Sequence, residues 1–218
     1  MDFNPLDLIL HLDVYLDMLV TNYGTWVYAI LFLVIFCETG LVVTPFLPGD
    51  SLLFIAGAVA AGGAMDPLLL GGLLMLAAIL GDSTNYLIGR TAGEKLFSNP
   101  DSKIFRRDYL QQTHDFYDKH GGKTVTLARF LPIIRTFAPF VAGVGKMNYL
   151  RFFGFSVLGT VLWVGGLVTL GYFFGNVPFI KQNLSLLVVG IILVSLLPMI
   201  ISLVRSKLSQ RASKAHPR

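Results

Sequence analysis

The lengths of the stretches without charged residues constrain the fold of this chain most strongly. A helix that crosses a bilayer needs roughly 20 mostly apolar residues to cover about 30 Å of hydrocarbon. Four stretches are this long: residues 18–37, 67–89, 152–174 and 184–204. Asp82 interrupts the second stretch and has to be tolerated within it. The sequence therefore predicts an all-α integral membrane protein with four transmembrane helices.

The composition agrees with a chain that exposes much of its surface to lipid. Apolar residues make up 54% of the 218 residues and charged residues 14%, whereas soluble domains carry about 25% charged residues. The mean hydropathy is +0.68. The net charge of +4 comes mainly from two basic stretches, and no soluble basic module with interleaved aromatic residues occurs. Nucleic-acid binding is therefore not expected.

Two further apolar segments are too short or too interrupted to span a membrane. Residues 41–65 contain two prolines, one of them Pro48, and the uncharged run 51–65 has only fifteen residues. Residues 124–147 are interrupted by two arginines and by two prolines, one of them Pro132. Non-helical backbone is tolerated at membrane depth only where protein or a water-filled cavity covers it. We therefore expect two re-entrant helical hairpins; interfacial loops are the alternative.

Lysine and arginine counts predict the orientation of the chain. Residues 90–123 hold seven of these side chains, and the tail 205–218 holds five. Because cytoplasmic loops are enriched in lysine and arginine, we expect short cytoplasmic helices at 94–120 and a cytoplasmic tail. Tracing the predicted spans back from these segments places the N-terminus in the cytoplasm as well. Residues 1–17 mix leucines with acids and are expected to form an interfacial helix.

The two short segments share a sequence pattern. Each contains Phe-Leu-Pro followed by Ala-Gly, so that Pro48 precedes Gly57 and Pro132 precedes Gly143. Each segment leads into a long helix, and the two predicted units have opposite orientations. An inverted-topology repeat of broken helices is a recurring plan of transporters, whose substrate sites lie near the midplane. The sequence thus predicts one membrane transport domain over residues 18–204.

Charges of opposite sign accompany the two halves. Glu38 and Asp50 lie beside the first hairpin, and Arg129 and Arg135 lie in the second. A charge at bilayer depth costs about 2.5 to 3.5 kcal/mol on insertion scales, so these residues are functional candidates. The arginine fork suits an anionic phosphate, and buried carboxylates near arginine suit proton coupling. The alternative is that the acids simply neutralise the arginines and lock the hairpins together.

A third group is expected to support the site. Asp82, Tyr86 and Arg90 recur every four residues on one helix face, a spacing that favours an ion pair at the cytoplasmic end of this helix. Trp26 and Trp163 are interpreted as aromatic residues at lipid or at the membrane interface. No cluster of metal ligands such as His-Glu-x-x-His occurs, and neither a metal nor another cofactor is expected.

Three segments together resemble one protein family: ETGLVVTPFLPGDSLLFIAG, GDSTNYLIGR and ARFLPIIRTFAPFVAGVGKM. They are similar to the DedA family of bacterial inner-membrane proteins, which share the SNARE-associated or VTT domain, and the resemblance covers nearly the whole chain. It implies that the two acids and two arginines required in the family fall on Glu38, Asp50, Arg129 and Arg135. It further implies transport that depends on the proton-motive force and, for several members, recycling of undecaprenyl phosphate.

Two functions remain open at this stage. The first is a proton-coupled flippase for a polyprenyl phosphate, with membrane lipids and protons as partners. The second is a proton-coupled small-ion antiporter involved in membrane homeostasis, in which Glu38 and Asp50 form the ion site and the arginines are structural. An intramembrane enzyme is not expected, because the polar stretch around His114 and His120 carries no nucleophile motif. The sequence leaves open whether the chain forms a homo-oligomer.

Overall fold

The computed structural model describes residues 12–41, 49–96, 121–175, 177–178 and 190. The described elements are, in chain order, α2 (Leu12–Tyr23), α3 (Trp26–Gly40), α4 (Gly49–Ala61), α5 (Pro67–Leu96), α7 (Lys123–Ala128), α8 (Pro132–Val144), α9 (Tyr149–Thr160), the π-helix η1 (Val161–Gly165) and α10 (Gly166–Phe174). The all-α prediction is confirmed for this part of the chain. Outside it lie Pro48, residues 1–11, most of the segment 94–120, the predicted span 184–204 except residue 190, and the tail 205–218.

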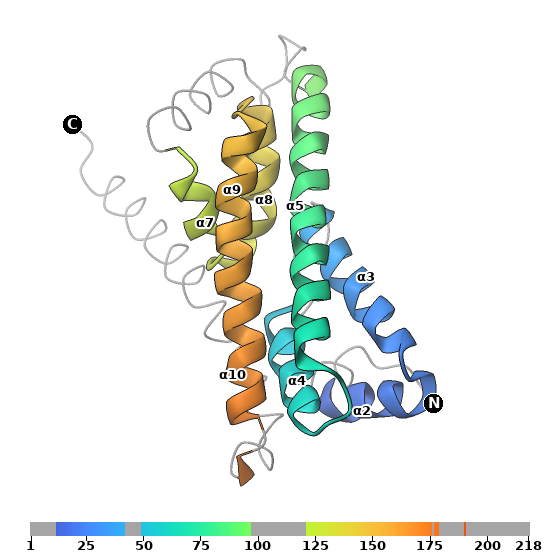
Figure 1. The fold of residues 1–218 in the computed structure, drawn as a ribbon. Helices are drawn as coiled ribbons and strands as arrows, with labels where there is room; N and C mark the ends of the chain where they lie inside the picture. Colours follow the sequence, from blue (N-terminus) through green and yellow to red (C-terminus); the bar gives the residue numbers. More distant parts are fainter. Residues whose placement is uncertain (1–11, 42–48, 97–120, 176, 179–189, 191–218) are drawn as a thin grey trace, which may run out of the picture.

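Two long helical stretches run antiparallel beside each other through the molecule (Figure 1). The first is α5, and the second is the continuous series α9, η1 and α10. By length and composition, Pro67–Ala92 and Tyr149–Phe174 are suited to cross a membrane, with 26 residues each. At 1.5 Å per residue such a helix is about 39 Å long, which exceeds the hydrocarbon thickness. The predicted spans at 67–89 and 152–174 therefore lie within helices that are long and apolar enough to cross a membrane.

Residues 18–37 do not form the single span that the sequence predicts. Helix α2 continues to Tyr23, Gly24 adopts φ +53°, and α3 begins at Trp26. Glycine takes this left-handed conformation without the steric penalty of a side chain, and the length of a stretch without charged residues does not register such a break. α2 lies across the end of the molecule at which α5 begins (Figure 1), and the fifteen residues of α3 reach only about 22 Å. The prediction of a cytoplasmic N-terminus depends on this span and loses its basis.

The two segments identified as short contribute short helices. Residues 41–65 contain the 13-residue α4, and residues 124–147 contain most of α7 and all of α8. Pro132 is at the start of α8, where its missing N–H removes no helical hydrogen bond. Helix α4 packs mainly against α10, and α8 packs mainly against α5. Each short helix therefore lies on the long helix of the other half of the chain.

Glycines allow both of these packings to be close. A Cβ added at Gly57 of α4 would collide with the backbone carbonyl of Val168 in the second long helix. A Cβ added at Gly143 of α8 would likewise collide with the carbonyl of Tyr86 in α5. These are the two glycines that follow the Phe-Leu-Pro motifs in the sequence. They are needed because the backbones of two helices approach each other without intervening side chains.

The long helices contribute reciprocal glycines to the same crossings. Gly171 of α10 lies against the carbonyl of Phe54, and Gly89 of α5 lies against the carbonyl of Phe140. In the short helices, Gly57 and Gly143 each come three residues after the phenylalanine whose carbonyl meets the other helix. In the long helices, Gly171 and Gly89 each come three residues after the residue whose carbonyl meets the short helix. The two crossings therefore correspond residue by residue.

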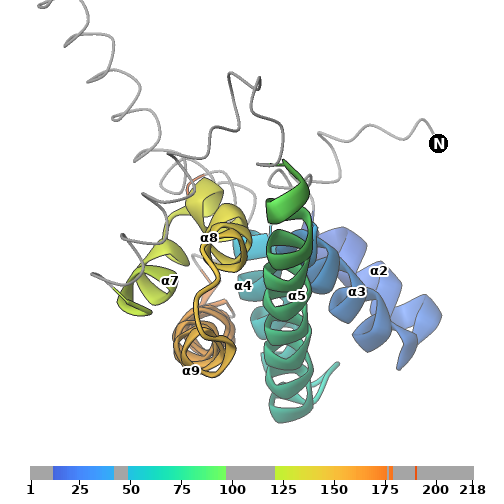
Figure 2. The ribbon, with the colours of Figure 1, turned by 90° about the horizontal axis from the view of Figure 1, so that it is seen from above.

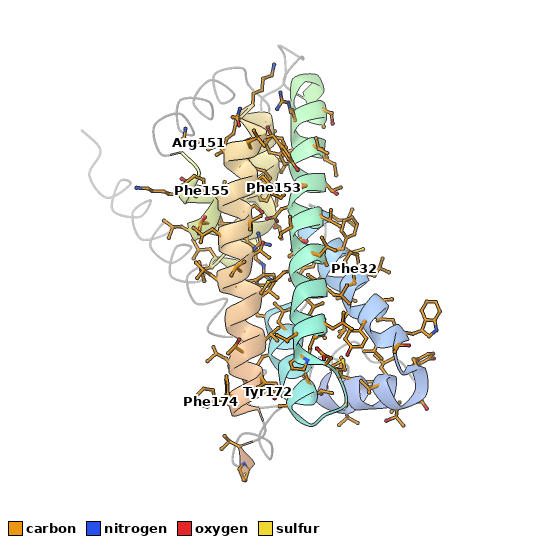
Figure 3. The ribbon with its side chains drawn as sticks, in the orientation of Figure 1. Phe32, Arg151, Phe153, Phe155, Tyr172 and Phe174 are labelled. Atoms are coloured by element: carbon orange, nitrogen blue, oxygen red, sulfur yellow. The ribbon has the colours of Figure 1, made fainter. Side chains whose placement is uncertain are left out.

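Seen from above, α3 and α8 lie on opposite sides of α5 (Figure 2). Many large apolar side chains are exposed, among them Phe153 of α9 and Phe174 of α10 (Figure 3). Leu68 and Leu150, near the starts of the two long stretches, are 86% and 78% exposed. An exposed apolar surface of this extent is suited to contact with lipid rather than water.

Candidate functional site

Charged side chains gather where the short helices end. Glu38 lies in the last turn of α3, Asp50 in the first turn of α4, and Arg135 in the first turn of α8. These ends meet the middle of the long stretches, at Asp82 in α5 and at Trp163 in η1. The fold thus brings residues from both halves of the chain into one buried centre.

Arg135 bridges two acids that come from separate helices. Its Nη2 donates a hydrogen bond to Oε1 of Glu38, and its Nη1 donates to Oδ1 of Asp50, each at 2.5 Å. Glu38 is fully buried, whereas the side chain of Asp50 is 18% exposed. Hydrogen bonds between ionised partners are the strong ones in proteins. The predicted meeting of acids and base across the two halves is present for these three residues.

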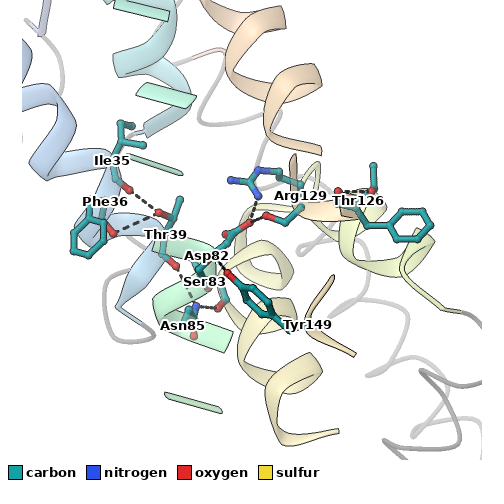
Figure 4. Close-up of polar contacts among 12 residues, drawn as sticks. Ile35, Phe36, Thr39, Asp82, Ser83, Asn85, Thr126, Arg129 and Tyr149 are labelled. Atoms are coloured by element: carbon teal, nitrogen blue, oxygen red, sulfur yellow. Dashed lines mark hydrogen bonds and ion pairs between the residues drawn. The ribbon is translucent and has the colours of Figure 1, made fainter. Parts of the chain in front are cut away.

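Arg129 pairs with a different acid. It donates from Nη1 to Oδ2 of Asp82 (Figure 4). The hydroxyl of Ser156 donates to the same oxygen at 2.5 Å. Arg129 is only 5% exposed. Its Nε and Nη2 are buried and have no hydrogen-bond partner within the described part of the chain.

The predicted ion pair within α5 is not formed. Asp82 and Arg90 are eight residues apart, which is about 12 Å along a helix, and Asp82 instead contacts Arg129. Nη1 of Arg90 donates to the hydroxyl of Tyr86 at 2.9 Å. That hydroxyl donates in turn to the carbonyl of Met147. Tyr86 and Arg90 therefore link α5 to the connection between α8 and α9, and Asp82 belongs to the charged centre.

Trp163 lies beside both arginines. The Cζ atom of Arg135 is 4.6 Å from the centroid of the indole ring, and that of Arg129 is 5.4 Å away. Both distances are within the range of cation–π attraction. The indole N–H donates to Oδ1 of Asp50 at 2.8 Å. Assigning Trp163 to lipid or the interface was therefore wrong, although Trp26 is 72% exposed as expected.

Asn85 connects the two helix ends that carry Glu38 and Arg135. Its Nδ2 donates to the carbonyl of Thr39 at 3.1 Å and to the carbonyl of Thr136 at 2.7 Å (Figure 4). Each carbonyl belongs to the residue after a charged one. Asn85 was not among the predicted site residues. Its amide inside a predicted span is nevertheless a signal, because a buried amide needs hydrogen-bond partners.

Among the residues that the structure describes, the centre contains more acids than bases. Its ionisable members are the carboxylates of Glu38, Asp50 and Asp82 and the guanidinium groups of Arg129 and Arg135. If all are ionised the net charge is negative by one, and one added proton neutralises it. Oε2 of Glu38 is buried without a hydrogen-bond partner in the described residues. In that same part of the chain, no three histidine, cysteine or acidic side chains come together as metal ligands.

The chain has two long apolar helices, an apolar outer surface and ion pairs buried near the middle of these helices. These features are typical of helical membrane proteins whose buried charges are functional candidates. Residues 45–173 match the VTT domain. Protein DedA of Escherichia coli K12 is 60% identical over 212 residues, which cover 96% of this chain and 97% of that protein. The chain belongs to the DedA family of VTT-domain membrane proteins.

Two further relatives show lower identity. An uncharacterized membrane protein of Mycobacterium leprae is 47% identical over 169 residues, which cover 78% of this chain and 76% of that protein. Inner membrane protein YqjA of Escherichia coli K12 is 38% identical over 157 residues, or 72% and 71% of the two chains. No solved structure gives a significant match.

Proposed function

We propose that this protein is a transporter of the bacterial inner membrane that moves an anionic lipid phosphate, such as undecaprenyl phosphate, across the bilayer and is driven by the proton-motive force. The observation that carries the proposal is the buried centre, in which Nε and Nη2 of Arg129 have no partner among the described residues and lie beside a surplus of carboxylates. Buried charges are costly in a membrane, and a plain anchor does not need them.

The arginines are suited to the phosphate headgroup. A guanidinium group stays protonated and binds phosphate oxygens through two parallel hydrogen bonds. Nε and Nη2 of Arg129 are adjacent donors of this kind. Arg135 already donates to Glu38 and Asp50, so it becomes available when one of these acids takes up a proton. In this proposal the lipid tail stays in the bilayer, against the apolar outer surface.

Glu38 is the acid best placed to carry the proton. It lies at the carboxyl end of α3, where the helix dipole disfavours a negative charge, whereas Asp50 lies at the amino end of α4, where the dipole favours one. A proton on Glu38 would remove the negative charge from one of the two acids that hold Arg135 and so weaken that hydrogen bond. The membrane potential contributes about 2.3 kcal/mol per charge per 100 mV, which is enough to bias such a step.

The proposed topology follows the same logic. Helices α3 and α4 form one re-entrant hairpin, α7 and α8 form the other, and the two enter from opposite sides, while α5 and the stretch Tyr149–Phe174 cross the bilayer. The corresponding glycine crossings support an inverted repeat. By the positive-inside rule the basic connection 90–123 is cytoplasmic, and therefore α7 and α8 enter from the cytoplasm.

Proteoliposomes with a fluorescent polyprenyl phosphate and an imposed pH gradient test this proposal. Arg129→Gln is expected to slow flipping about tenfold or more, because a hydrogen bond to a charged group contributes about 1.5 to 3 kcal/mol. Glu38→Gln is expected to abolish the acceleration by the pH gradient. Arg151→Gln is the matched control, since Arg151 is exposed on α9. If Arg129→Gln and Arg135→Gln both flip lipid as fast as this control, the assigned role of the arginines is wrong.

The surplus of carboxylates also favours a second candidate, a proton-coupled small-ion antiporter. In that case Glu38 and Asp50 would bind the ion, and the arginines would only balance charge. Liposomes without polyprenyl phosphate separate the two functions. Ion movement driven by a pH gradient in such liposomes, with loss of movement in Glu38→Gln, would favour the antiporter over the flippase.

A further inference from the structure

Trp163 occupies an irregular part of the second long helix. The five residues Val161–Gly165 form a π-helix between α9 and α10, whereas α5 is α-helical from end to end. π-helical turns within α-helices occur frequently at functional sites. The π-helix therefore makes the second long stretch different from α5, and it does so beside the charged centre.

The indole contacts both arginines of the centre and one of its acids. Its N–H donates to Asp50, the partner of Arg135, and its ring attracts the guanidinium groups of Arg135 and Arg129. Trp163 is itself only 5% exposed. The indole N–H and the face of the indole ring thus both contact charged residues.

A ring stabilises a guanidinium group in a way that a carboxylate does not. Cation–π attraction acts through the face of the ring and uses no hydrogen-bond acceptor. A second carboxylate beside Arg129 would instead accept from its remaining N–H groups and occupy them. Trp163 therefore compensates part of the buried positive charge while Nε and Nη2 of Arg129 stay unpartnered among the described residues.

We propose that Trp163 is a positioning residue for anion binding, whose ring holds both guanidinium groups and leaves donors of Arg129 free for the phosphate monoester of a lipid. This inference rests on the proposed function. It adds a residue whose contribution depends on an aromatic face. The indole N–H, by contrast, acts only on Asp50.

Two substitutions separate the ring from the N–H. Trp163→Phe keeps an aromatic face and loses the donor, whereas Trp163→Leu is apolar and loses both. Binding of farnesyl phosphate to the purified full-length protein is expected to weaken about 2- to 30-fold in Trp163→Leu. Most of the affinity is expected to remain in Trp163→Phe. A purely structural role predicts that affinity follows thermal stability in both variants, so Tm is measured alongside binding.

A fluorescence experiment on folded protein gives an independent readout. The chain has two tryptophans, and Trp26 lies outside the site with 72% exposure, so Trp26→Phe leaves Trp163 as the single emitter. Its emission is expected to change saturably with farnesyl phosphate, and not with farnesol, which lacks the phosphate. Adding Arg129→Gln to this background is expected to abolish the change.

The outcomes distinguish this inference from the proposed function. If Trp26→Phe protein binds farnesyl phosphate in a thermal-shift assay, but its emission is unchanged and Trp163→Leu binds equally well, the role of Trp163 is overturned and the transport proposal stands. If Trp26→Phe and unaltered protein both fail to bind farnesyl phosphate more tightly than farnesol, the phosphate assignment fails and the inference fails with it.

Discussion

Several charges of the centre lie at helix ends, and the sign of each charge matters there. A helix dipole favours anions at the amino end and cations at the carboxyl end. Glu38 at the end of α3 and Arg135 at the start of α8 both lie at the unfavourable end of their own helix. Their direct hydrogen bond at 2.5 Å compensates both. Glu38 and Arg135 therefore depend on each other more strongly than the two members of an ordinary ion pair do.

This dependence predicts a rescue. Arg135→Gln is expected to lower thermal stability in detergent, because Glu38 then remains buried at a carboxyl end without a cation. Adding Glu38→Gln is expected to restore part of the loss, with a coupling of about 1 to 3 kcal/mol between the two positions. The measurement is a double-mutant cycle on unfolding midpoints. Additive losses would contradict the mutual dependence.

A second cycle identifies the partner of Asp82. Asp82→Asn and Arg129→Gln are expected to be coupled by about 1 to 3 kcal/mol, because neighbours in one ion pair do not act independently. Asp82→Asn and Arg90→Gln are expected to add within about 0.5 kcal/mol, since these side chains are distant. Thermal unfolding of the single and double variants measures both. If Asp82→Asn were coupled to Arg90→Gln instead, the result would support the Asp82–Arg90 ion pair that the spacing of four residues predicts.

At the scale of helices, the glycine crossings fix how closely the short helices approach the long ones. Gly57 and Gly143 meet backbone carbonyls, which cannot move aside as the end of a flexible side chain can. Alanine at either position must push two helices apart along their whole contact. The effect on packing is therefore larger than the size of one methyl group suggests.

Gly57→Ala and Gly143→Ala are accordingly expected to destabilise the protein by about 1 to 3 kcal/mol, the usual cost of overpacking. Gly154→Ala is the matched control, because nothing lies within 4 Å of an added Cβ and the residue is in the interior of α9. That variant is expected to be neutral or more stable by about 0.5 to 1 kcal/mol. Equal midpoints for Gly57→Ala and Gly154→Ala would show that the crossing is not close.

The sequence predicted the elements that depend on local properties. The long helices follow from uncharged length, and the irregular segments follow from prolines and charges. The division between α2 and α3 was not predicted, because it depends on a positive φ at Gly24, inside a stretch whose uncharged length matches a span. The pairing of Arg129 with Asp82 also could not be predicted, since it depends on how two halves of the chain pack. Trp163 gave a weak signal, because it lies near the middle of a span rather than at its end.

At the scale of the whole molecule, the two halves are interlocked. Because α4 lies on α10 and α8 lies on α5, neither half can move as a body without carrying part of the other. In our proposal, opening of the centre therefore involves the hairpin ends near Glu38 and Arg135, while the glycine crossings stay packed. The ion pairs would then separate on one side at a time.

The proposed inverted repeat makes a prediction about sidedness. Ala64 lies in the exposed turn between α4 and α5, and Leu150 lies near the start of α9, at opposite ends of the two long helices. In a Cys37→Ala background, which removes the single native cysteine, Ala64→Cys is expected to react with an impermeant maleimide from the periplasmic side. Leu150→Cys is expected to react only from the cytoplasmic side, as the basic connection before α7 requires. Labelling of both positions from one face would mean that the long helices do not cross the bilayer, and the two hairpins would then have to enter from the same side.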